Sequence, residues 1–430
     1  MKYGIGDEVR VVHKNKTDTG ILIKDSPLLI LKLSSGYNIG IDKKNIKKIE
    51  RVKKAREIKE TPISVKQNKK LPMVSILHTG GTVASKVDYR TGGVVSRFEA
   101  EELIGLFPEL GGIAQISSQM LGNMWSDDIR FSHFNRIGKA VKKEVDSGAS
   151  GIIVSMGTDN LHYAAAALSF ILDPCPVPVL FVGAQRSSDR GSSDAAYNLL
   201  SAATFIAKSD FAGVGLCMHE NMSDDYCWIL PGCKVRKMHS SRRDAFRPIG
   251  TSSIARVGWK EKKIEFMKKE YSKRSSEKIG LHLFAENLKV GLVKVHPQFF
   301  SAELVAYTGF DGLLLEGTGL GHIPLDVVDE STKEHEKVKK VLAGLCKKMP
   351  VVMSSQTIYG RIQMNVYSKG RDLQELGVRG NLCNMTPETA FVKLAWLLSQ
   401  KKKKEDVLTL YEENLRGEIS ERTEQDWFLE

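Results

Sequence analysis

Short runs of apolar and β-branched residues alternate with longer runs of helical periodicity between residue 71 and about residue 285. The short runs predict strands and the longer runs predict helices. The expected strands are 73–78, 151–155, 178–184 and 212–218, and the expected helices are 98–107, 128–147, 161–172 and 193–208. Strands that alternate with helices form βαβ units, so this region is expected to build a mostly parallel sheet.

The same alternation returns after a polar, basic stretch at 266–286. It predicts strands at 289–295, 311–317 and 350–356 and helices at 299–308, 327–347 and 387–399. Thr386 suits the N-cap of the last helix, and Pro387 suits its first turn. We therefore expect two α/β subdomains, at 72–285 and 286–400, and then a charged tail at 401–430 that forms one helix and a frayed end.

The first fifty residues follow a different pattern. Short β-branched segments at 8–12, 19–24, 28–36 and 37–50 are separated by turn residues, which predicts a small all-β domain. If 37–50 is counted as two strands, there are five strands in residues 1–50, which suits an SH3-like or OB-like barrel. Residues 51–71 have little periodicity and are expected to be a basic linker.

The charge of the chain is concentrated at its beginning. The formal net charge is +12, and residues 1–70 alone hold 18 Lys and Arg against 8 Asp and Glu, a net charge of +10. Such a concentration of positive charge can attract an RNA backbone. It is equally typical of a small soluble domain with a solvated linker, so charge alone leaves both interpretations open.

The composition indicates a cytoplasmic globular protein. No apolar run reaches the roughly 18–20 residues of a membrane span, since the best candidate, 167–182, is interrupted by Asp173 and three prolines. The first residues lack the apolar core of a signal peptide. The six cysteines include no CxxC pair, and none pairs with a histidine as zinc ligands usually do, so they are expected to be reduced, and no metal site is expected.

Two threonine motifs carry the candidate chemistry. HTGGTVAS (78–85) follows the expected strand 73–78, and MGTDN (156–160) follows the expected strand 151–155. Thr79 and Thr158 are therefore expected at the carboxyl ends of two strands, where ligands bind in open parallel sheets. A hydroxyl on a glycine-flanked turn can approach a carbonyl closely, which indicates threonine-based acyl chemistry without a cofactor.

Each motif also has an ordinary structural interpretation. Thr79 could close a turn, and Thr158 with Asp159 could cap a helix. A phosphate-binding loop is disfavoured because no GK[ST] follows the glycines. The general base is missing from both motifs, and a lysine kept neutral by burial could supply it, but spacing cannot choose among the lysines.

HTGGTVAS and MGTDN resemble the paired threonine signatures of the bacterial-type L-asparaginase family, over residues 72–400. The resemblance implies a two-subdomain, parallel-sheet α/β fold that hydrolyses side-chain amides through a threonine acyl-enzyme. It implies that Thr79 is the nucleophile and that Thr158, Asp159 and a lysine form a second constellation. The matching stretch, KVRKMHSSRRDAF (234–246), favours Lys237 and leaves Lys234 as the alternative.

The same resemblance implies further site residues. Tyr89, in VDYRTGG (87–93), matches a lid tyrosine that hydrogen-bonds the nucleophile, and the glycines of that segment would supply hinge freedom. Ser126 and Asp127, in WSDDI (125–129), match the segment that holds the substrate's α-carboxylate and α-ammonium groups. Asp159 is also a candidate contact of the α-ammonium. Plain asparaginases often have Gln where Asp127 stands.

Other segments narrow the resemblance to the D subunits of archaeal glutamyl-tRNA(Gln) amidotransferases. These segments are 182–199, 316–324, 354–371 and 385–398, and free-standing asparaginases lack the β-rich domain and basic linker. Two departures, Ile129 for Met and Gly191 for Pro, do not touch the implied chemistry.

The D-subunit resemblance implies that the chain hydrolyses glutamine to glutamate and ammonia. An E subunit would bind Glu-tRNA(Gln) and activate it with ATP and magnesium, and the ammonia would pass between the two subunits. The chain itself would need no cofactor, would self-associate through its α/β part and would not contact a membrane. The alternatives are a free-standing L-asparaginase and a non-enzymatic RNA-binding scaffold.

Overall fold

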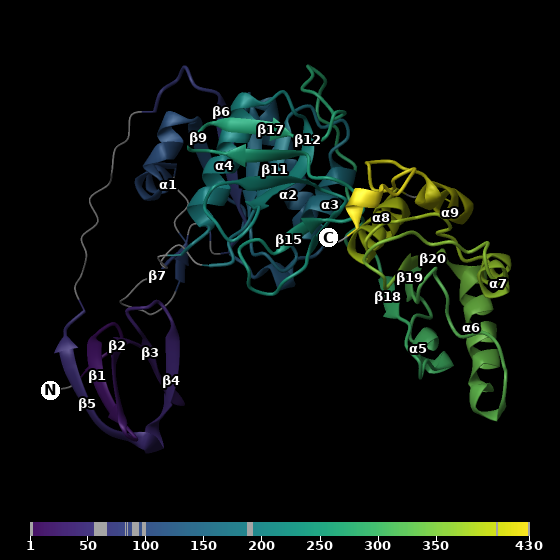
Figure 1. The fold of residues 1–430 in the computed structure, drawn as a ribbon, viewed down its shortest axis with the longest axis horizontal. Helices are drawn as coiled ribbons and strands as arrows, with labels where there is room; N and C mark the ends of the chain where they lie inside the picture. The colour runs from purple at the N-terminus through teal and green to yellow at the C-terminus, as the bar shows by residue number, and fades with distance from the viewer. Residues whose placement is uncertain are drawn as a thin grey trace.

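The computed structural model describes residues 3–55, 67–81, 83, 85–87, 94–96, 100–186, 192–400 and 403–428, with only the backbone of 85–87 and 94–96. It contains a small all-β domain, a large α/β subdomain and a smaller α/β subdomain (Figure 1). The fold class expected from the sequence is confirmed. All six cysteines are free thiols, as predicted. Within the described ranges, no helix is long and apolar enough to cross a membrane.

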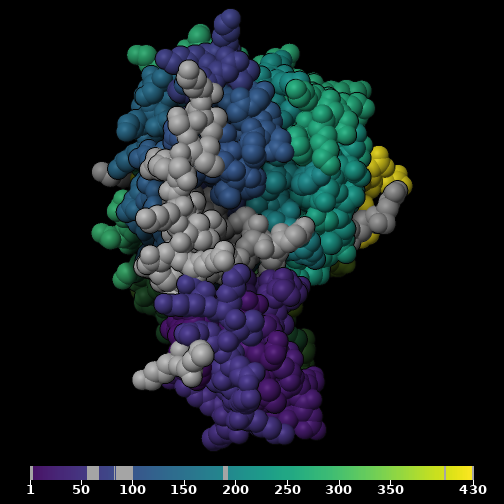
Figure 2. Space-filling view, turned by 90° about the vertical axis from the view of Figure 1, so that its left-hand side faces the viewer, coloured from purple at the N-terminus to yellow at the C-terminus, as the bar shows by residue number. Residues whose placement is uncertain are grey.

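The N-terminal domain is one antiparallel sheet of five strands in the order β4-β3-β2-β1-β5. The strands are β1 (Glu8–His13), β2 (Lys16–Asp25), β3 (Leu28–Lys32), β4 (Asn38–Asp42) and β5 (Ile46–Lys53). Alternate residues such as Val9 and Val11 point inward to a core of their own. In the space-filling view the domain is a purple lobe below the larger body (Figure 2).

The large subdomain is built on an eight-stranded sheet in the order β17-β16-β13-β12-β11-β10-β6-β9. Its parallel strands are β6 (Met73–His78), β9 (Gln115–Met120), β10 (Gly151–Ser155), β11 (Pro178–Val182) and β12 (Gly213–His219). From β6 the chain goes first to β9 on one side and then to β10 on the other. The strand order therefore reverses between β6 and β10, and such switch points open a crevice at the carboxyl edge.

Helices cover both faces of this sheet. Helices α2 (Phe131–Asp146) and α3 (Leu161–Ile171) pack on one face, and α4 (Ala195–Lys208) packs on the other, while α1 (Ala100–Leu106) lies near β9. Strand β10 is apolar on both sides, because Ile152 and Val154 enter one core cluster and Ile153 enters another. This two-sided burial is why the strand has a continuous apolar sequence.

Three antiparallel strands extend the sheet beyond the prediction. They are β13 (Cys227–Pro231), β16 (Ala255–Gly258) and β17 (Lys263–Phe266). Two small hairpins were also missed: β14 (Val235–Lys237) with β15 (Phe246–Pro248), and β7 (Ser85–Val87) with β8 (Val94–Ser96). Strand β9 was missed because QISSQM is mostly polar. The side chain of Gln67, from the predicted linker, bonds both the N–H and the carbonyl of Ile116 in β9.

The smaller subdomain has the parallel sheet β18-β19-β20. Its elements are β18 (Val290–Lys294), α5 (Ser301–Val305), β19 (Gly312–Gly317), α6 (Glu334–Lys348), β20 (Val351–Ser355), α7 (Ser368–Leu376), α8 (Pro387–Ser399) and α9 (Lys404–Glu412). Thr386 caps α8 by accepting from the N–H of Thr389, and Pro387 starts the helix, as predicted. Helix α8 packs against both α3 and β19, and so joins the two subdomains.

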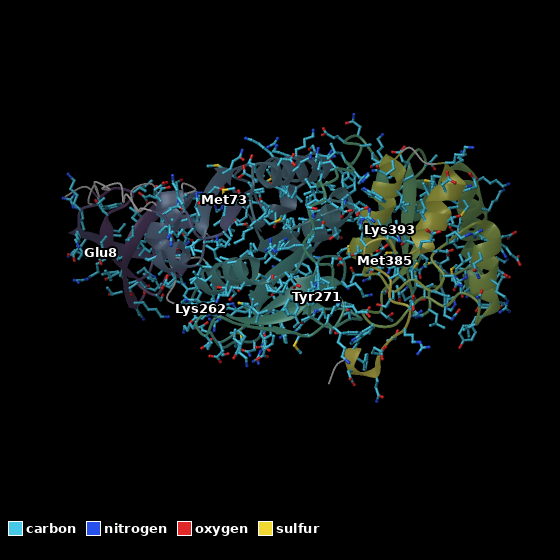
Figure 3. The ribbon with its side chains drawn as sticks, turned by 90° about the horizontal axis from the view of Figure 1, so that it is seen from above. Glu8, Met73, Lys262, Tyr271, Met385 and Lys393 are labelled. Carbon is cyan, nitrogen blue, oxygen red and sulfur yellow. The ribbon has the colours of Figure 1, made fainter. Side chains whose placement is uncertain are left out.

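The predicted frayed end is wrong at least as far as Ser420. Glu418 is fully buried and pairs at 2.6 Å with Lys393 of α8, which is also fully buried. Figure 3 shows Lys393 among the side chains of the C-terminal helices. The Ser420 N–H donates to Asn384 Oδ1 at 3.0 Å. The charged tail therefore packs into the interior because the Glu418 carboxylate pairs with the buried Lys393 ammonium.

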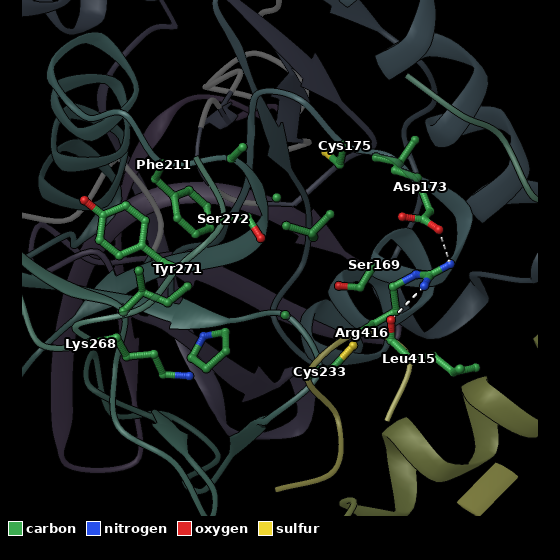
Figure 4. A pocket seen from close by; sticks show the side chains of 18 of the residues that line it. Ser169, Asp173, Cys175, Phe211, Cys233, Lys268, Tyr271, Ser272, Leu415 and Arg416 are labelled. Carbon is green, nitrogen blue, oxygen red and sulfur yellow. Dashed lines mark hydrogen bonds and ion pairs between the residues drawn. The ribbon is translucent and has the colours of Figure 1, made fainter. Parts of the chain in front are cut away.

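The tail also closes one wall of a cavity at the opposite edge of the large sheet from the two threonine motifs. The cavity has a volume of about 460 Å³ and lies between the start of β12, the connecting segment 268–272 and the tail. Arg416 of the tail pairs with Asp173 at 2.7 Å across its rim (Figure 4).

Candidate active site

The two threonine motifs leave the sheet at the same edge, from neighbouring strands. His78, the last residue of β6, is paired with Ser155, the last residue of β10. Thr79 comes next and stays tied to the second strand, because its N–H donates to the Ser155 carbonyl at 3.0 Å and its hydroxyl donates to the same carbonyl at 3.3 Å. Thr79 is 4% exposed. It therefore lies at the switch point of the sheet.

Two glycines let this turn press against its neighbours. Gly80 and Gly81 have φ angles of +119° and +88°, which other residues rarely adopt. A Cβ on Gly81 would lie 2.6 Å from the N atom of Gly157, and a Cβ on Gly80 would lie 2.3 Å from the carbonyl oxygen of Met124. The Thr79 turn is thus in contact with the turn that precedes Thr158.

A lysine from a distant hairpin reaches the second motif. Lys237 Nζ, at the end of β14, donates to Thr158 Oγ1 at 2.8 Å and to Asp159 Oδ1 at 2.6 Å. The Lys237 side chain is 10% exposed, whereas that of Asp159 is 62% exposed. The ammonium is therefore largely removed from water and held by a hydroxyl and a carboxylate, while the carboxylate stays open to a ligand.

Lys234, the alternative lysine, lies elsewhere. It is 2% exposed, and its Nζ donates to the carbonyl of Asn384 in the smaller subdomain at 3.3 Å. Burial, with a contribution from the charge of Lys268, lowers its pKa to about 8. Residues three apart on an extended chain point to opposite sides, so Lys234 and Lys237 face different parts of the molecule.

The Thr158 and Asp159 side chains do not cap the helix that follows them. Helix α3 starts at Leu161 with Asn160 in the N-cap position, and the Asn160 side chain makes no capping hydrogen bond. The Asn160 side chain instead donates to the carbonyl of Ser126 at 2.9 Å. The Thr158 and Asp159 side chains therefore bond Lys237 in the site.

Ser126 lies directly against the Thr158 turn, since a Cβ on Gly157 would come within 3.0 Å of Ser126 Oγ. Ser126 is 4% exposed, whereas Asp127, in the same 3-10 turn, is exposed. Tyr89 and the glycines of its segment lie outside the described residues. Of the predicted site, the structure thus gathers Thr79, Thr158, Asp159, Lys237 and Ser126 at one edge.

Two neighbours of the site were not predicted. The Thr158 hydroxyl donates to Gln185 Oε1 at 3.4 Å, from the loop after β11. His78 Nδ1 lies 2.6 Å from Ser155 Oγ beneath the Thr79 turn, and burial lowers the pKa of His78 to about 4, so its ring is neutral at pH 7. His78 is the first residue of HTGGTVAS, but the sequence pattern assigned it no role.

The arrangement suits nucleophilic chemistry. It brings together two hydroxyls, a desolvated ammonium and backbone N–H groups on glycine turns, which are parts that acyl transfer requires. Among the side chains that the structure describes, no group of three or more His, Cys, Asp or Glu residues is arranged to bind a metal ion.

Three family models match the chain. Residues 73–272 match "Asparaginase, N-terminal", residues 289–410 match "Glutaminase/Asparaginase C-terminal domain", and residues 3–52 match "GatD N-terminal domain". A solved L-asparaginase from Thermococcus kodakarensis is 29% identical, with a TM-score of 0.68 over 81% of this chain and 100% of that chain. L-asparaginase I from Vibrio cholerae, at 23% identity and a TM-score of 0.69, shares the fold over 81% of this chain and 99% of its own. Fold and site together define a member of the asparaginase class of amidohydrolases.

Curated relatives specify the family within that class. The D subunit of the glutamyl-tRNA(Gln) amidotransferase of Pyrococcus horikoshii is 41% identical over 99% of this chain and 97% of its own length. The D subunit from Pyrococcus abyssi is 43% identical over the same shares, and the one from Methanosphaera stadtmanae is 38% identical over 99% and 96%. The chain belongs to the family of glutamyl-tRNA(Gln) amidotransferase D subunits.

Proposed function

We propose that this chain is the glutaminase subunit of a glutamyl-tRNA(Gln) amidotransferase. It hydrolyses the side-chain amide of glutamine and delivers the ammonia to a partner that amidates Glu-tRNA(Gln). Family membership over 99% of the chain supports the activity. The observation that carries the chemistry is the 2.8 Å contact between Lys237 Nζ and Thr158 Oγ1, beside Thr79.

Thr79 is the nucleophile in this proposal. Its Oγ attacks the carboxamide carbon, and its proton passes towards Tyr89 or through Thr158 to Lys237, which accepts it as the neutral amine and becomes the ammonium. Backbone N–H groups near Gly80 and Gly81, or that of Thr158, stabilise the oxyanion. The C–N bond breaks, the amine takes up a proton and leaves as ammonia, and water hydrolyses the resulting ester to release glutamate.

The α-groups of glutamine are held on the open side of the site. Ser126 and Asp127 contribute from the 3-10 turn at 126–128, and Asp159 contributes a carboxylate whose side chain is 62% exposed. Asp159 thus has two roles: one oxygen orients Lys237, and the rest of the carboxylate attracts the α-ammonium group.

The partner in this proposal is the E subunit, which binds Glu-tRNA(Gln) and uses ATP and magnesium to activate the glutamyl carboxyl group. The two chains form a heterodimer, and this chain also self-associates through its α/β part in the cytoplasm. The matched N-terminal domain at 3–52 favours this proposal over a free-standing L-asparaginase. The gathered side chains of Thr79, Thr158, Asp159 and Lys237 argue against a non-enzymatic RNA-binding scaffold.

The test compares two lysines three residues apart. Lys237→Met should lower ammonia release from glutamine by about 10²–10⁴-fold, the usual size of a lost proton-transfer group, and Thr79→Ala should abolish it. Lys234→Met is the matched control, because its Nζ contacts Asn384 and not the site, and it should keep the rate within about threefold. Denaturant unfolding of each variant confirms that the protein is folded.

The partner is tested in the same assay. Ammonia release should rise when the E subunit, ATP and Glu-tRNA(Gln) are added. Near-full activity of Lys237→Met would contradict the proposed mechanism. An unchanged rate with the partner, together with rapid asparagine turnover by the isolated chain, would favour the free-standing asparaginase.

A further inference from the structure

A buried amide behind the site has a defined orientation. Asn198 of α4 is fully buried, and its Nδ2 donates to the carbonyl of Gly183 at 3.0 Å and to Asp194 Oδ2 at 3.2 Å. Both partners are acceptors, so the NH₂ group must face them. The amide oxygen, Asn198 Oδ1, therefore faces His219 Nδ1 at 2.6 Å.

This orientation fixes the protons of His219. The Nδ1 atom must carry hydrogen, because its neighbour is an amide oxygen. The Nε2 atom lies 3.2 Å from Asp224 Oδ1, which is also an acceptor. With acceptors at both nitrogens, the ring keeps both hydrogens and a positive charge. The His219 side chain is fully buried, so this charge is held entirely by protein groups.

One end of the His219 network reaches Gln185. Asp194 occupies the N-cap position of α4, but its carboxylate accepts from the backbone N–H groups of Gln185 at 3.0 Å and Arg186 at 2.9 Å. It thereby anchors the loop from which Gln185 Oε1 accepts the Thr158 hydroxyl hydrogen. The path from His219 to Thr158 runs through Asn198, Asp194 and Gln185.

The other end reaches the hairpin that carries Lys237. Asp224, in the turn between β12 and β13, accepts from Arg243 Nη1 at 2.5 Å. Arg243 lies in the connection from β14 to β15, and it also donates to the carbonyl of Met222. The imidazolium therefore supports a carboxylate that holds the segment following Lys237.

We propose that His219 is a cationic positioning residue that braces both hydrogen-bond partners of the Thr158 hydroxyl, Gln185 on one side and Lys237 on the other. The inference rests on the proposed glutaminase function and deepens it. In this proposal His219 does not contact the substrate. It holds Gln185, which accepts from the Thr158 hydroxyl, and Lys237, which donates to it, in position.

The surroundings of His219 favour its charge on balance. Burial lowers the pKa of His219, but the negative charge of a Cys227 thiolate, whose own pKa is lowered by its neighbours, outweighs burial together with Asp224 and Asp194, so the pKa of His219 lies above the usual value. The Cys227 Sγ lies 3.9 Å from Nδ1. The Tyr197 ring packs edge-on at 5.7 Å. Arg243 Nη1 donates to the same Asp224 oxygen, Oδ1, that His219 Nε2 faces, so the two cations share this carboxylate.

The charge is tested directly, without any activity. In the full chain labelled with ¹⁵N-histidine, both ring nitrogens of His219 should have the chemical shifts of protonated nitrogens at pH 7. The spectrum of His219→Gln identifies the signals. A neutral ring with one unprotonated nitrogen at pH 7 would overturn the inference, whether or not the chain is a glutaminase.

The positioning role is tested by kinetics. His219→Gln should lower kcat for glutamine about tenfold or more with little change in KM. His296→Gln, at an exposed histidine bonded to Glu303, should change neither. Asp224→Asn should move the alkaline limb of kcat to lower pH by at least about half a unit, in step with the NMR titration of His219. A limb that stays in place while the NMR titration moves would contradict the proposal.

These readouts separate the two proposals. If Lys237→Met loses activity but the alkaline limb of kcat in Asp224→Asn stays where it is in the unmodified protein, the glutaminase function stands and the role of His219 is contradicted. A charged His219 in a chain without glutaminase activity contradicts the proposed function instead. If His219→Gln does not fold, the Asp224→Asn titration still decides.

Discussion

Two strand ends in this molecule have nearly the same local sequence and very different surroundings. MGTDN follows β10, the strand between β6 and β11, and EGTGLG lies at the end of β19, the strand between β18 and β20. At the first, Lys237 reaches Thr158 from 79 residues away. At the second, the Thr318 hydroxyl donates to the carbonyl of His322, four residues on, at 3.3 Å.

The difference is the kind of partner that the hydroxyl has. Ser355, at the end of β20, donates to the backbone carbonyl of Gly319 at 2.6 Å and bonds the Thr357 hydroxyl. These hydroxyls stabilise turns of their own subdomain. Thr158 is instead placed between an ammonium and an amide from two other segments. A threonine at the end of a parallel strand thus becomes a candidate reactive group when side chains of other segments, here an ammonium and an amide, are its partners.

The largest expected effect comes from removing each hydroxyl. Thr158→Val keeps the shape of the side chain but deprives Lys237 of one of its two partners, so glutaminase activity should fall about 10²–10⁴-fold. Thr318→Val should leave activity within about twofold, because an exposed hydroxyl is worth little. Initial rates of ammonia release measure both. Equal losses in the two variants would end the distinction between the strand ends.

A methyl group on one glycine at each edge tests the packing. Gly81→Ala places a Cβ 2.6 Å from Gly157 N at φ +88°, and it should lower the free energy of unfolding by about 3 kcal/mol or more, from strain and overpacking. Gly319→Ala has φ +51° and nothing within 4 Å, so only about 1–2 kcal/mol of strain is expected. Denaturant unfolding of both variants measures the difference. Similar losses would mean that the two threonine turns do not press together.

Acid pH should lower the free energy of unfolding more through His78, at the Thr79 edge, than through His322, at the Thr318 edge. The pKa of His78 is lowered to about 4 by burial, so the unfolded chain binds this proton first, near pH 6.5. The stability that neutral His78 supports is present above about pH 6.5 and is lost as the pH falls towards 4, by up to about 3 kcal/mol.

The control for this acid sensitivity is His322, whose pKa is lowered by its lesser burial and by Lys369. Replacing His78 with Asn should flatten the decline of unfolding free energy between pH 6.5 and 4, and His322→Asn should flatten it less. Curves that change equally would show that depth of burial does not separate the two edges.

Much of the fold was predictable because its parallel strands are apolar on both faces. The bounds 73–78 and 151–155 agree with β6 and β10. Strand β9 escaped because it lies at the sheet edge and has a polar sequence, and β13, β16 and β17 belong to an antiparallel extension without intervening helices. The expected helix 327–347 begins only at Glu334, because Asp329 caps a separate 3-10 turn before it.

The site was predictable only in part. Glycine-flanked threonines after apolar strands predicted the edge at which Thr79 and Thr158 lie. Spacing could not select Lys237; family resemblance favoured it, and its contact depends on a three-residue strand. The hydrophobic pattern of the sequence did not predict Gln185 or the His219 network, because each contact joins residues from different segments through buried polar atoms.

The buried ion pair between Lys393 and Glu418 makes the C-terminal tail part of the packed interior. Trimming the sequence before Glu418 would strand an ammonium in an apolar interior, and breaking such a pair by removing one member costs about 3–5 kcal/mol. Helix α8, which carries Lys393, rests on α3, and α3 begins two residues after Asp159. A fusion partner or affinity tag at the carboxyl end would therefore disturb a segment that is only two helices away from the edge that carries Thr79 and Thr158.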